Sequence, residues 1–272
     1  MILFIASEVD VASMNIAHQL ITNNDFEKTS EYFDGNPIYS KKLEDGEIGK
    51  LIFIKEEPVN TQFLVLPFTS RLLIYLSRHS SKSGTSTLSV HTPGNIGEAS
   101  LGGLARKVSI SPASAMKEAL NMMKKTQEES GLDYEVSYEC THHGPSLNIP
   151  TMFIELGSSP MQWQDSAAAS AVAEGAMAAA TCKKTYFTVL GIGGPHYNKK
   201  FTEIALNTEK AFGHIIPKYA ISKMDLDMLR QCIDRTVEDV KEIILDWKGI
   251  VGSDKKALLH LLDKIDLEAK KI

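Results

Sequence analysis

Residues 151–191, TMFIELGSSPMQWQDSAAASAVAEGAMAAATCKKTYFTVLG, decide the fold class of this chain. The apolar run TMFIEL predicts a buried strand, and KTYFTVLG at 184–191 predicts another. Between them, residues 166–181 are rich in alanine and predict a helix whose small side chains allow it to lie close against a sheet. A strand, a helix and a second strand in this order are typical of an α/β fold.

The same alternation extends in both directions from this stretch. Helices are expected where apolar residues recur at helical spacing: 11–21, 111–130, 223–247 and 254–271. The segment 111–130 begins with Ser-Pro and ends before Gly131, as is typical of a helix. Strands are expected where short apolar or alternating runs end in turn residues: 1–7, 62–70, 71–80, 87–95 and 134–139. We therefore predict a three-layer α/β/α sandwich with a mixed, largely parallel sheet.

Residues 23–60 differ from the rest, because Asn, Asp, Gly and Pro interrupt short segments there. This pattern indicates a β-rich excursion with hairpins rather than core. We predict a single catalytic domain over residues 1–272 that carries this excursion.

The composition excludes several classes of protein. A net charge of -5 argues against a uniformly basic nucleic-acid binder, although a local basic patch remains compatible with it. Three widely spaced cysteines do not make a disulfide scaffold or a four-cysteine zinc site. The N-terminus lacks a basic region and a long apolar segment, and the alanine-rich stretch is too short and too weakly apolar to span a bilayer, so we expect a cytoplasmic protein with no membrane association.

Polar side chains recur at the ends of the predicted strands. Sites in open α/β sheets form in the crevice beyond the carboxyl ends of the strands, so these side chains are expected to share one pocket. They are His79, His91, His142, His143, Glu155 and His196.

The members of this group are expected to have different roles. His142, His143 and His196 have Gly and Pro beside them, which give tight turns where a ligand approaches closely. His79 and His91, each taken alone, are typical of hydrogen-bonded loop residues; within the group we place them in the substrate-binding part of the pocket.

Imidazoles combined with a carboxylate suit zinc, which keeps an open position for water in catalytic sites. We predict His142, Glu155 and His196 as zinc ligands, with the second histidine of the His142–His143 pair moving a proton or contacting substrate. Glu155 is equally suited to act as a general base.

Other motifs are weak. The glycines at 191–194 lack the spacing of a dinucleotide-binding loop, and Ser158 and Ser159 do not lie in a G-x-S-x-G nucleophile motif. Cys140 lies in an alternating strand and is predicted to be a buried structural cysteine. Lys199 and Lys200 follow GGPHYN at the rim of the proposed pocket and are predicted to bind a phosphate-bearing substrate.

Four segments together resemble one family over essentially the whole chain: SRHSS, HTPGNIGEASLGG, ECTHHGPSLNIPTMFIELGSSPMQW and GIGGPHY. The family is the archaeal and plant type of D-aminoacyl-tRNA deacylase. The resemblance implies a phosphorylase/hydrolase-like fold and a zinc-dependent hydrolase that uses one zinc ion or more. It also implies the 3′ acceptor end of a mischarged aminoacyl-tRNA as substrate, and no protein partner.

The chemistry of an ester fits this resemblance. Zinc supplies an activated water and polarises the carbonyl, and the backbone amides of Gly193 and Gly194 are predicted to stabilise the oxyanion. Two alternatives remain open on the residues alone. One is a zinc aminopeptidase- or amidohydrolase-like enzyme acting on a small molecule, and the other is a non-catalytic tRNA- or nucleoside-binding module.

Overall fold

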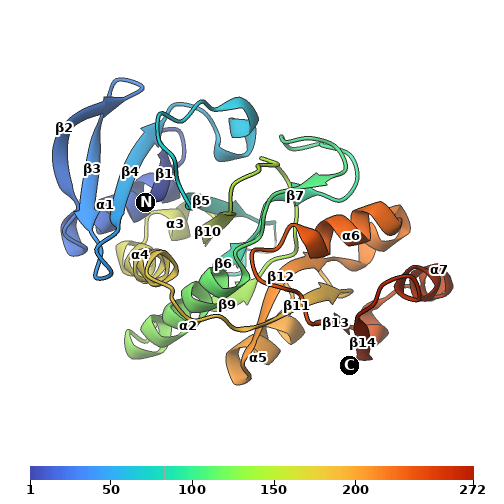
Figure 1. Cartoon of the computed structure of the whole chain (residues 1–272). Helices are drawn as coiled ribbons and strands as arrows, with labels where there is room; N and C mark the ends of the chain where they lie inside the picture. Colours follow the sequence, from blue (N-terminus) through green and yellow to red (C-terminus); the bar gives the residue numbers. More distant parts are fainter. Residues whose placement is uncertain (83) are drawn as a thin grey trace.

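An eight-stranded mixed sheet forms the centre of the fold in the computed structural model, which describes residues 1–82 and 84–272 (Figure 1). Its strands lie in the order β2-β3-β4-β1-β5-β10-β6-β9. Four of the neighbouring pairs are parallel and three are antiparallel. The strands are β1 (Ile2–Ser7), β2 (Glu27–Phe33), β3 (Asn36–Lys42), β4 (Ile48–Ile54), β5 (Leu72–Ser80), β6 (Thr87–His91), β9 (Glu135–Tyr138) and β10 (Thr151–Ser158). The predicted α/β fold with a mixed, largely parallel sheet is confirmed.

A second sheet of four parallel strands lies beside the first. Its order is β12-β11-β13-β14, and a short antiparallel pair, β7 (Gly94–Asn95) and β8 (Lys107–Val108), lies apart from both sheets. The four strands are β11 (Phe187–Ile192), β12 (Lys210–Ile216), β13 (Glu242–Leu245) and β14 (Glu268–Lys271). The predicted strand at 184–191 therefore forms β11 of this second sheet.

Backbone hydrogen bonds join the two sheets just beyond β9. The Cys140 amide donates to the His196 carbonyl at 2.9 Å, and the Asn198 amide donates to the Tyr138 carbonyl at 3.0 Å. The Thr141 amide donates to the carbonyl of Ile215 in β12 at 2.8 Å. The chain segments that carry the predicted histidines are thus held at the junction between the sheets.

The helices and 3-10 turns cover the sheets. They are α1 (Val11–Asn23), α2 (Ala113–Glu129), α3 (Pro160–Trp163), α4 (Ser166–Ala180), α5 (Lys199–Asn207), α6 (Leu226–Asp234), α7 (Gly252–Leu262), η1 (Pro58–Phe63), η2 (Lys218–Lys223) and η3 (Trp247–Gly249). The alanine-rich α4 packs against α1, α2 and β10, and a Cβ added at Gly175 would lie 2.7 Å from the Met123 side chain. Small side chains on α4 are therefore required for this close packing.

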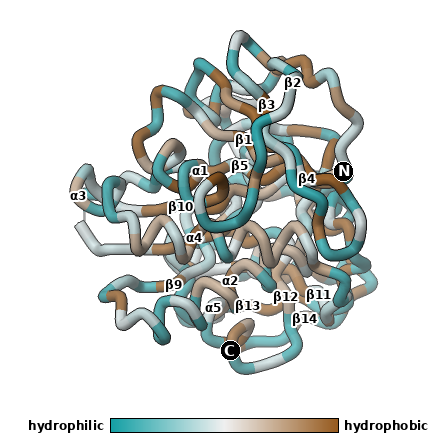
Figure 2. The backbone as a smooth tube through the Cα atoms, turned by 90° about the vertical axis from the view of Figure 1, so that its left-hand side faces the viewer, coloured by the Kyte–Doolittle hydropathy of each residue, from teal (hydrophilic) through white to brown (hydrophobic). Residues whose placement is uncertain are grey.

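The two faces of the large sheet are covered differently. One face packs against α1, α2 and α4. The other carries Ile5, Tyr75 and Phe153, which pack with side chains from residues 64–68 and 147–149. Figure 2 shows the hydrophobic segments gathered in the interior around β1 and β5.

Two predicted helices at the C-terminal end were partly wrong. The first ends at Asp234, and residues 242–245 form β13 between β11 and β14. The second ends at Leu262, and residues 268–271 form β14. Periodicity does not distinguish short apolar segments of strand from those of helix, and here pairing with β11 and β13 decides the outcome.

Residues 62–70 were predicted as a strand, but they form the end of η1 and an irregular segment. Their alternation is nevertheless real, because Leu64 and Leu66 pack on the sheet while Phe63 and Val65 are 84% and 83% exposed. An extended segment therefore lies over the sheet with one face on the core.

The segment 23–60 contains β2, β3 and β4. β4 pairs in parallel with β1, and its last four residues are buried. The β2–β3 hairpin extends the sheet outward from β4. Within the residues described, no helix is long and apolar enough to cross a membrane.

Candidate active site

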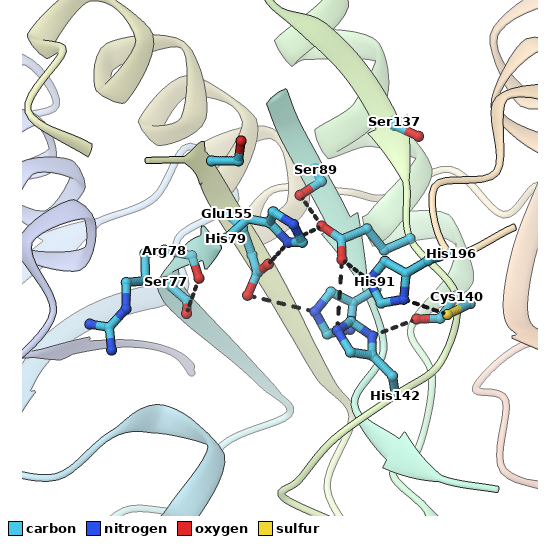
Figure 3. A network of polar contacts seen from close by, with 12 residues as sticks. Ser77, Arg78, His79, Ser89, His91, Ser137, Cys140, His142, Glu155 and His196 are labelled. Carbon is cyan, nitrogen blue, oxygen red and sulfur yellow. Dashed lines mark hydrogen bonds and ion pairs between the residues drawn. The ribbon is translucent and has the colours of Figure 1, made fainter. Parts of the chain in front are cut away.

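Seven side chains form one polar group, which we call the histidine–glutamate cluster. Figure 3 labels His79, His91, His142, Glu155 and His196 of this cluster. It contains His79 on β5, His91 at the end of β6, Glu155 on β10, and four residues from loops: Glu139, His142, His143 and His196. All six residues predicted from the strand ends are therefore brought together, and Glu139 is added to them.

Glu139 lies at the centre of the cluster, with its side chain fully buried. Its Oε1 lies 3.0 Å from Nδ1 of His79, and its Oε2 lies 2.7 Å from Nε2 of His196 and 3.7 Å from Nε2 of His142. The Ser89 hydroxyl also donates to Oε1. The signal for Glu139 in the sequence was a carboxylate at the end of a strand, three residues before the histidine pair.

Glu155 lies between His79 and His91, the two histidines that belong to strands of the large sheet. Its Oε2 lies 3.3 Å from Nδ1 of His79, and its Oε1 lies 3.7 Å from Nε2 of His91. His91 is 1% exposed, yet neither of its ring nitrogens has a hydrogen-bond partner in the part of the chain that the structure describes. Buried polar groups are rarely left without a partner, so this imidazole is suited to a ligand.

Backbone carbonyls fix the tautomers of the histidine pair. Nδ1 of His142 lies 2.8 Å from the Cys140 carbonyl, and Nδ1 of His143 lies 2.6 Å from the Gly144 carbonyl. A carbonyl only accepts, so each Nδ1 carries the proton and each Nε2 presents a lone pair. A hydrogen bond from one ring nitrogen to a carbonyl orients the other nitrogen in histidines that bind metals.

Burial and neighbouring charges give the histidines of the cluster different pKa values and therefore different charges at pH 7. Burial lowers the pKa of His142 well below its usual value, and burial together with His91 lowers the pKa of His143 to about 4. Burial also opposes charge on His79, but hydrogen bonds to Glu139 and Glu155 raise its pKa to about 10. The histidine pair is therefore neutral at pH 7, while His79 is charged and paired with carboxylates.

The donor atoms form several groups that suit a metal ion, in each of which they all lie within 4.8 Å of one another. The groups are His91–His142–His143, Cys140–His142–His196, His79–Glu139–His196 and His91–Glu139–Glu155. Among residues 1–82 and 84–272, no such group combines His142, Glu155 and His196, the set predicted from the sequence.

Two further side chains border the cluster. Cys140 is buried, as predicted, but its Sγ lies 3.3 Å from Nδ1 of His196 and 3.3 Å from the Tyr219 hydroxyl. The same hydroxyl lies 3.3 Å from Nδ1 of His196. Sequence reasoning missed Tyr219, because η2 is far along the chain from the other residues of the site.

The remaining predicted residues lie outside the cluster. The Gly193 amide donates to the Ile216 carbonyl at 2.8 Å, so it is not free to bind an oxyanion. The Gly194 carbonyl accepts from the Lys218 amide, and an oxyanion contact from the Gly194 amide stays a prediction. Lys199 pairs with Glu135 at 2.8 Å, and Lys200 pairs with Asp246 at 2.5 Å. Each lysine therefore has a carboxylate partner, and its predicted contact with phosphate stays a prediction.

A cavity of ≈ 150 Å³ leads to the histidine pair from the surface. Its walls are formed by residues 94–98, by Thr141 with the histidine pair, and by Pro217, Tyr219, Ala220 and Lys223. Pockets that hold a drug-sized ligand measure roughly 300–1,000 Å³, so only a small group enters this cavity.

The fold and the cluster together are typical of an α/β enzyme with a candidate active site of histidines and carboxylates. The sequence model of D-aminoacyl-tRNA deacylases matches residues 67–270, and the chain belongs to this family. It is 40% identical to the D-aminoacyl-tRNA deacylase of Pyrococcus abyssi and 38% identical to that of Thermococcus onnurineus, and each alignment covers 96% of both chains.

A solved structure has the same fold. The crystal structure of a conserved protein of unknown function superposes with a TM-score of 0.87 and 30% sequence identity, over 100% of this chain and 95% of that one. The predicted resemblance and the assignment to an enzyme family are thus confirmed. Membership of this family also argues against the small-molecule and non-catalytic alternatives.

Proposed function

We propose that this chain hydrolyses the ester bond of D-aminoacyl-tRNA with a zinc-activated water, and releases free tRNA and a D-amino acid. The observation that carries the metal-dependent part is His91, a buried imidazole without hydrogen-bond partners among the described residues. The substrate is supported by the deacylase names of the relatives.

The donor set fits zinc. His91, His142 and His143 form a group of three imidazoles, and the last two present their Nε2 lone pairs. Three histidines with an open position for water are typical of catalytic zinc. The separate group His79–Glu139–His196 is left to ion pairing in this proposal, because His79 is charged and its Nδ1 lies 3.0 Å from Glu139. In this proposal Glu155 leaves the ligand set that the sequence suggested.

When bound, zinc polarises the ester carbonyl and lowers the pKa of its water towards about 7. Glu155 is the base in this arrangement, because Oε1 faces His91 without a hydrogen bond. It accepts the proton of the attacking water and returns it to the ribose oxygen of the departing tRNA. His79 holds the other carboxylate oxygen in place at 3.3 Å.

The test is deacylation of matched D- and L-Tyr-tRNA by the purified full chain. The expected result is release of D-tyrosine and retention of L-tyrosine. Equal rates on both substrates would remove the stereospecific part of the proposal, and no release from either would remove the function itself.

A further inference from the structure

The 3-10 turn η2 forms the outer wall of the cavity in front of the cluster. Ala220 and Ile221 are buried and pack in the core of the second sheet. The Lys218 amide donates to the Gly194 carbonyl at 2.9 Å, which fixes the start of the turn. These core contacts and this hydrogen bond hold η2 against the second sheet, and its polar side chains point to solvent.

Tyr219, on η2, lies at the mouth of this cavity. It is 56% exposed, although its hydroxyl lies 3.3 Å from both Cys140 Sγ and His196 Nδ1. The hydroxyl is tied to the edge of the cluster while much of the residue remains open to solvent. A fixed, exposed aromatic ring is suited to stacking with a nucleic-acid base.

Two cations accompany this ring. Lys218 and Lys223 are exposed, and neither forms an ion pair with any residue that the structure describes. Lys223 lies over Gly97, where an added Cβ would be 2.7 Å from its Cδ. By contrast, Lys199 and Lys200 are each paired with a carboxylate. On an acidic chain, η2 thus provides unneutralised positive charge directly beside the entrance to the site.

We propose that η2 is the docking element for the 3′-terminal nucleotides of the tRNA, an inference that rests on the proposed function. The cavity of ≈ 150 Å³ admits the aminoacyl ester but leaves the terminal nucleoside at its mouth. There the terminal base stacks on the ring of Tyr219, and Lys218 and Lys223 contact the adjoining phosphates.

The charge part is tested with Lys218→Ala/Lys223→Ala on D-Tyr-tRNA. The matched control is Lys124→Ala/Lys125→Ala, which removes two charges from α2, where both lysines pair with glutamates of their own helix. Loss of two phosphate contacts flattens the salt dependence of kcat/KM by about 1.4 units of slope. The control keeps the wild-type slope. A test variant with the wild-type KM and slope overturns the proposal, as does a loss of slope only in Lys199→Ala/Lys200→Ala.

The stacking part is tested with Tyr219→Leu and Tyr219→Phe. Removing the ring raises KM by about tenfold with little change in kcat, whereas Phe retains the stacking. An equal loss in both variants, or a loss in kcat alone, would assign the effect to the hydroxyl and overturn the stacking. The wild-type rate distinguishes failure of the proposed function from failure of the docking site. If the wild-type protein releases no D-tyrosine, the proposed function is wrong; if all η2 variants release it normally, only the docking site is wrong.

Discussion

Oε2 of Glu139 lies 2.7 Å from Nε2 of His196, and this contact joins the two sheets of the protein. Glu139 follows β9 of the eight-stranded sheet, while His196 follows β11 of the four-stranded sheet. Neither sheet alone contains the histidine–glutamate cluster, so the geometry of the cluster depends on how the sheets are joined.

Glu139→Gln should damage both activity and stability. The variant removes a buried negative charge that His79 and His196 share. Breaking such a buried pair costs about 3–5 kcal/mol of the free energy of unfolding. We expect kcat to fall by about 100-fold or more, since the charged partners of the site lose their positions. Single-turnover deacylation and denaturant unfolding measure the two effects.

The matched control is Glu135→Gln, at the start of β9, the strand that Glu139 follows. Glu135 makes an exposed ion pair with Lys199, which contributes about 0–1 kcal/mol. If the two variants behave alike, the cluster does not depend on Glu139.

The double variant His142→Ala/His143→Ala should lose both turnover and bound zinc. The pair supplies two of the three imidazoles in the group with His91. Strand-end loops seldom hold up the core, so the fold should persist in circular dichroism. His260→Ala, on the exposed side of α7, is the control for metal content and rate. Normal activity in the double variant is incompatible with the site described here.

Gly102→Ala should disturb the loop that supports His143. An added Cβ would lie 1.9 Å from the Val59 carbonyl oxygen, and Gly102 has a φ of +68°. The neighbouring Leu101 carbonyl accepts the Gly144 amide at 2.8 Å, so the disturbance reaches the histidine loop. We expect a loss of more than about 2 kcal/mol in the free energy of unfolding together with a lower kcat.

Gly131→Ala provides the comparison for Gly102. It has a φ of +62°, and an added Cβ would meet no neighbouring atom within 4 Å among the described residues, so the substitution should cost only about 1 kcal/mol. Equal costs at the two positions would show that the contact with Val59 is unimportant.

His214 should contribute to acid sensitivity. Burial lowers its pKa to about 4, and its ring lies 3.0 Å from the Thr141 hydroxyl. The unfolded chain takes up this proton near pH 6.5, before the folded protein does, so the stabilising contribution is present above pH 6.5 and is lost as pH falls towards 4. The loss amounts to about 3 kcal/mol. Urea unfolding of His214→Gln should show a correspondingly flatter pH dependence, and an unchanged slope would contradict this assignment.

Much of the fold could be predicted from the sequence, because in long segments such as 113–129 and 151–158 the spacing of apolar residues indicates a helix or a strand without reference to distant residues. The four-residue strands β13 and β14 could not, since they are stabilised by pairing with strands that are distant in the sequence. Local patterns carry no information about such partners.

The candidate site, like the fold, could be predicted only in part from the sequence. Strand ends indicated the histidines and Glu155, because neighbouring strand ends share one crevice. Glu139 lies at a polar position at the end of an alternating strand, and it is buried by contacts with β5, β6 and the loop after β11, which are distant in the sequence. The ion pairs of Lys199 and Lys200 likewise join residues 64 and 46 positions apart, which is why these lysines looked free in the sequence.

The most direct test of the central claim is the single-turnover rate of D-Tyr-tRNA deacylation before chelation, after chelation and after addition of zinc, with zinc content measured at each step. Metal-activated water predicts that the rate and the zinc content fall together and that zinc restores both. A chelated, zinc-free protein that still releases D-tyrosine at the original rate would contradict the account.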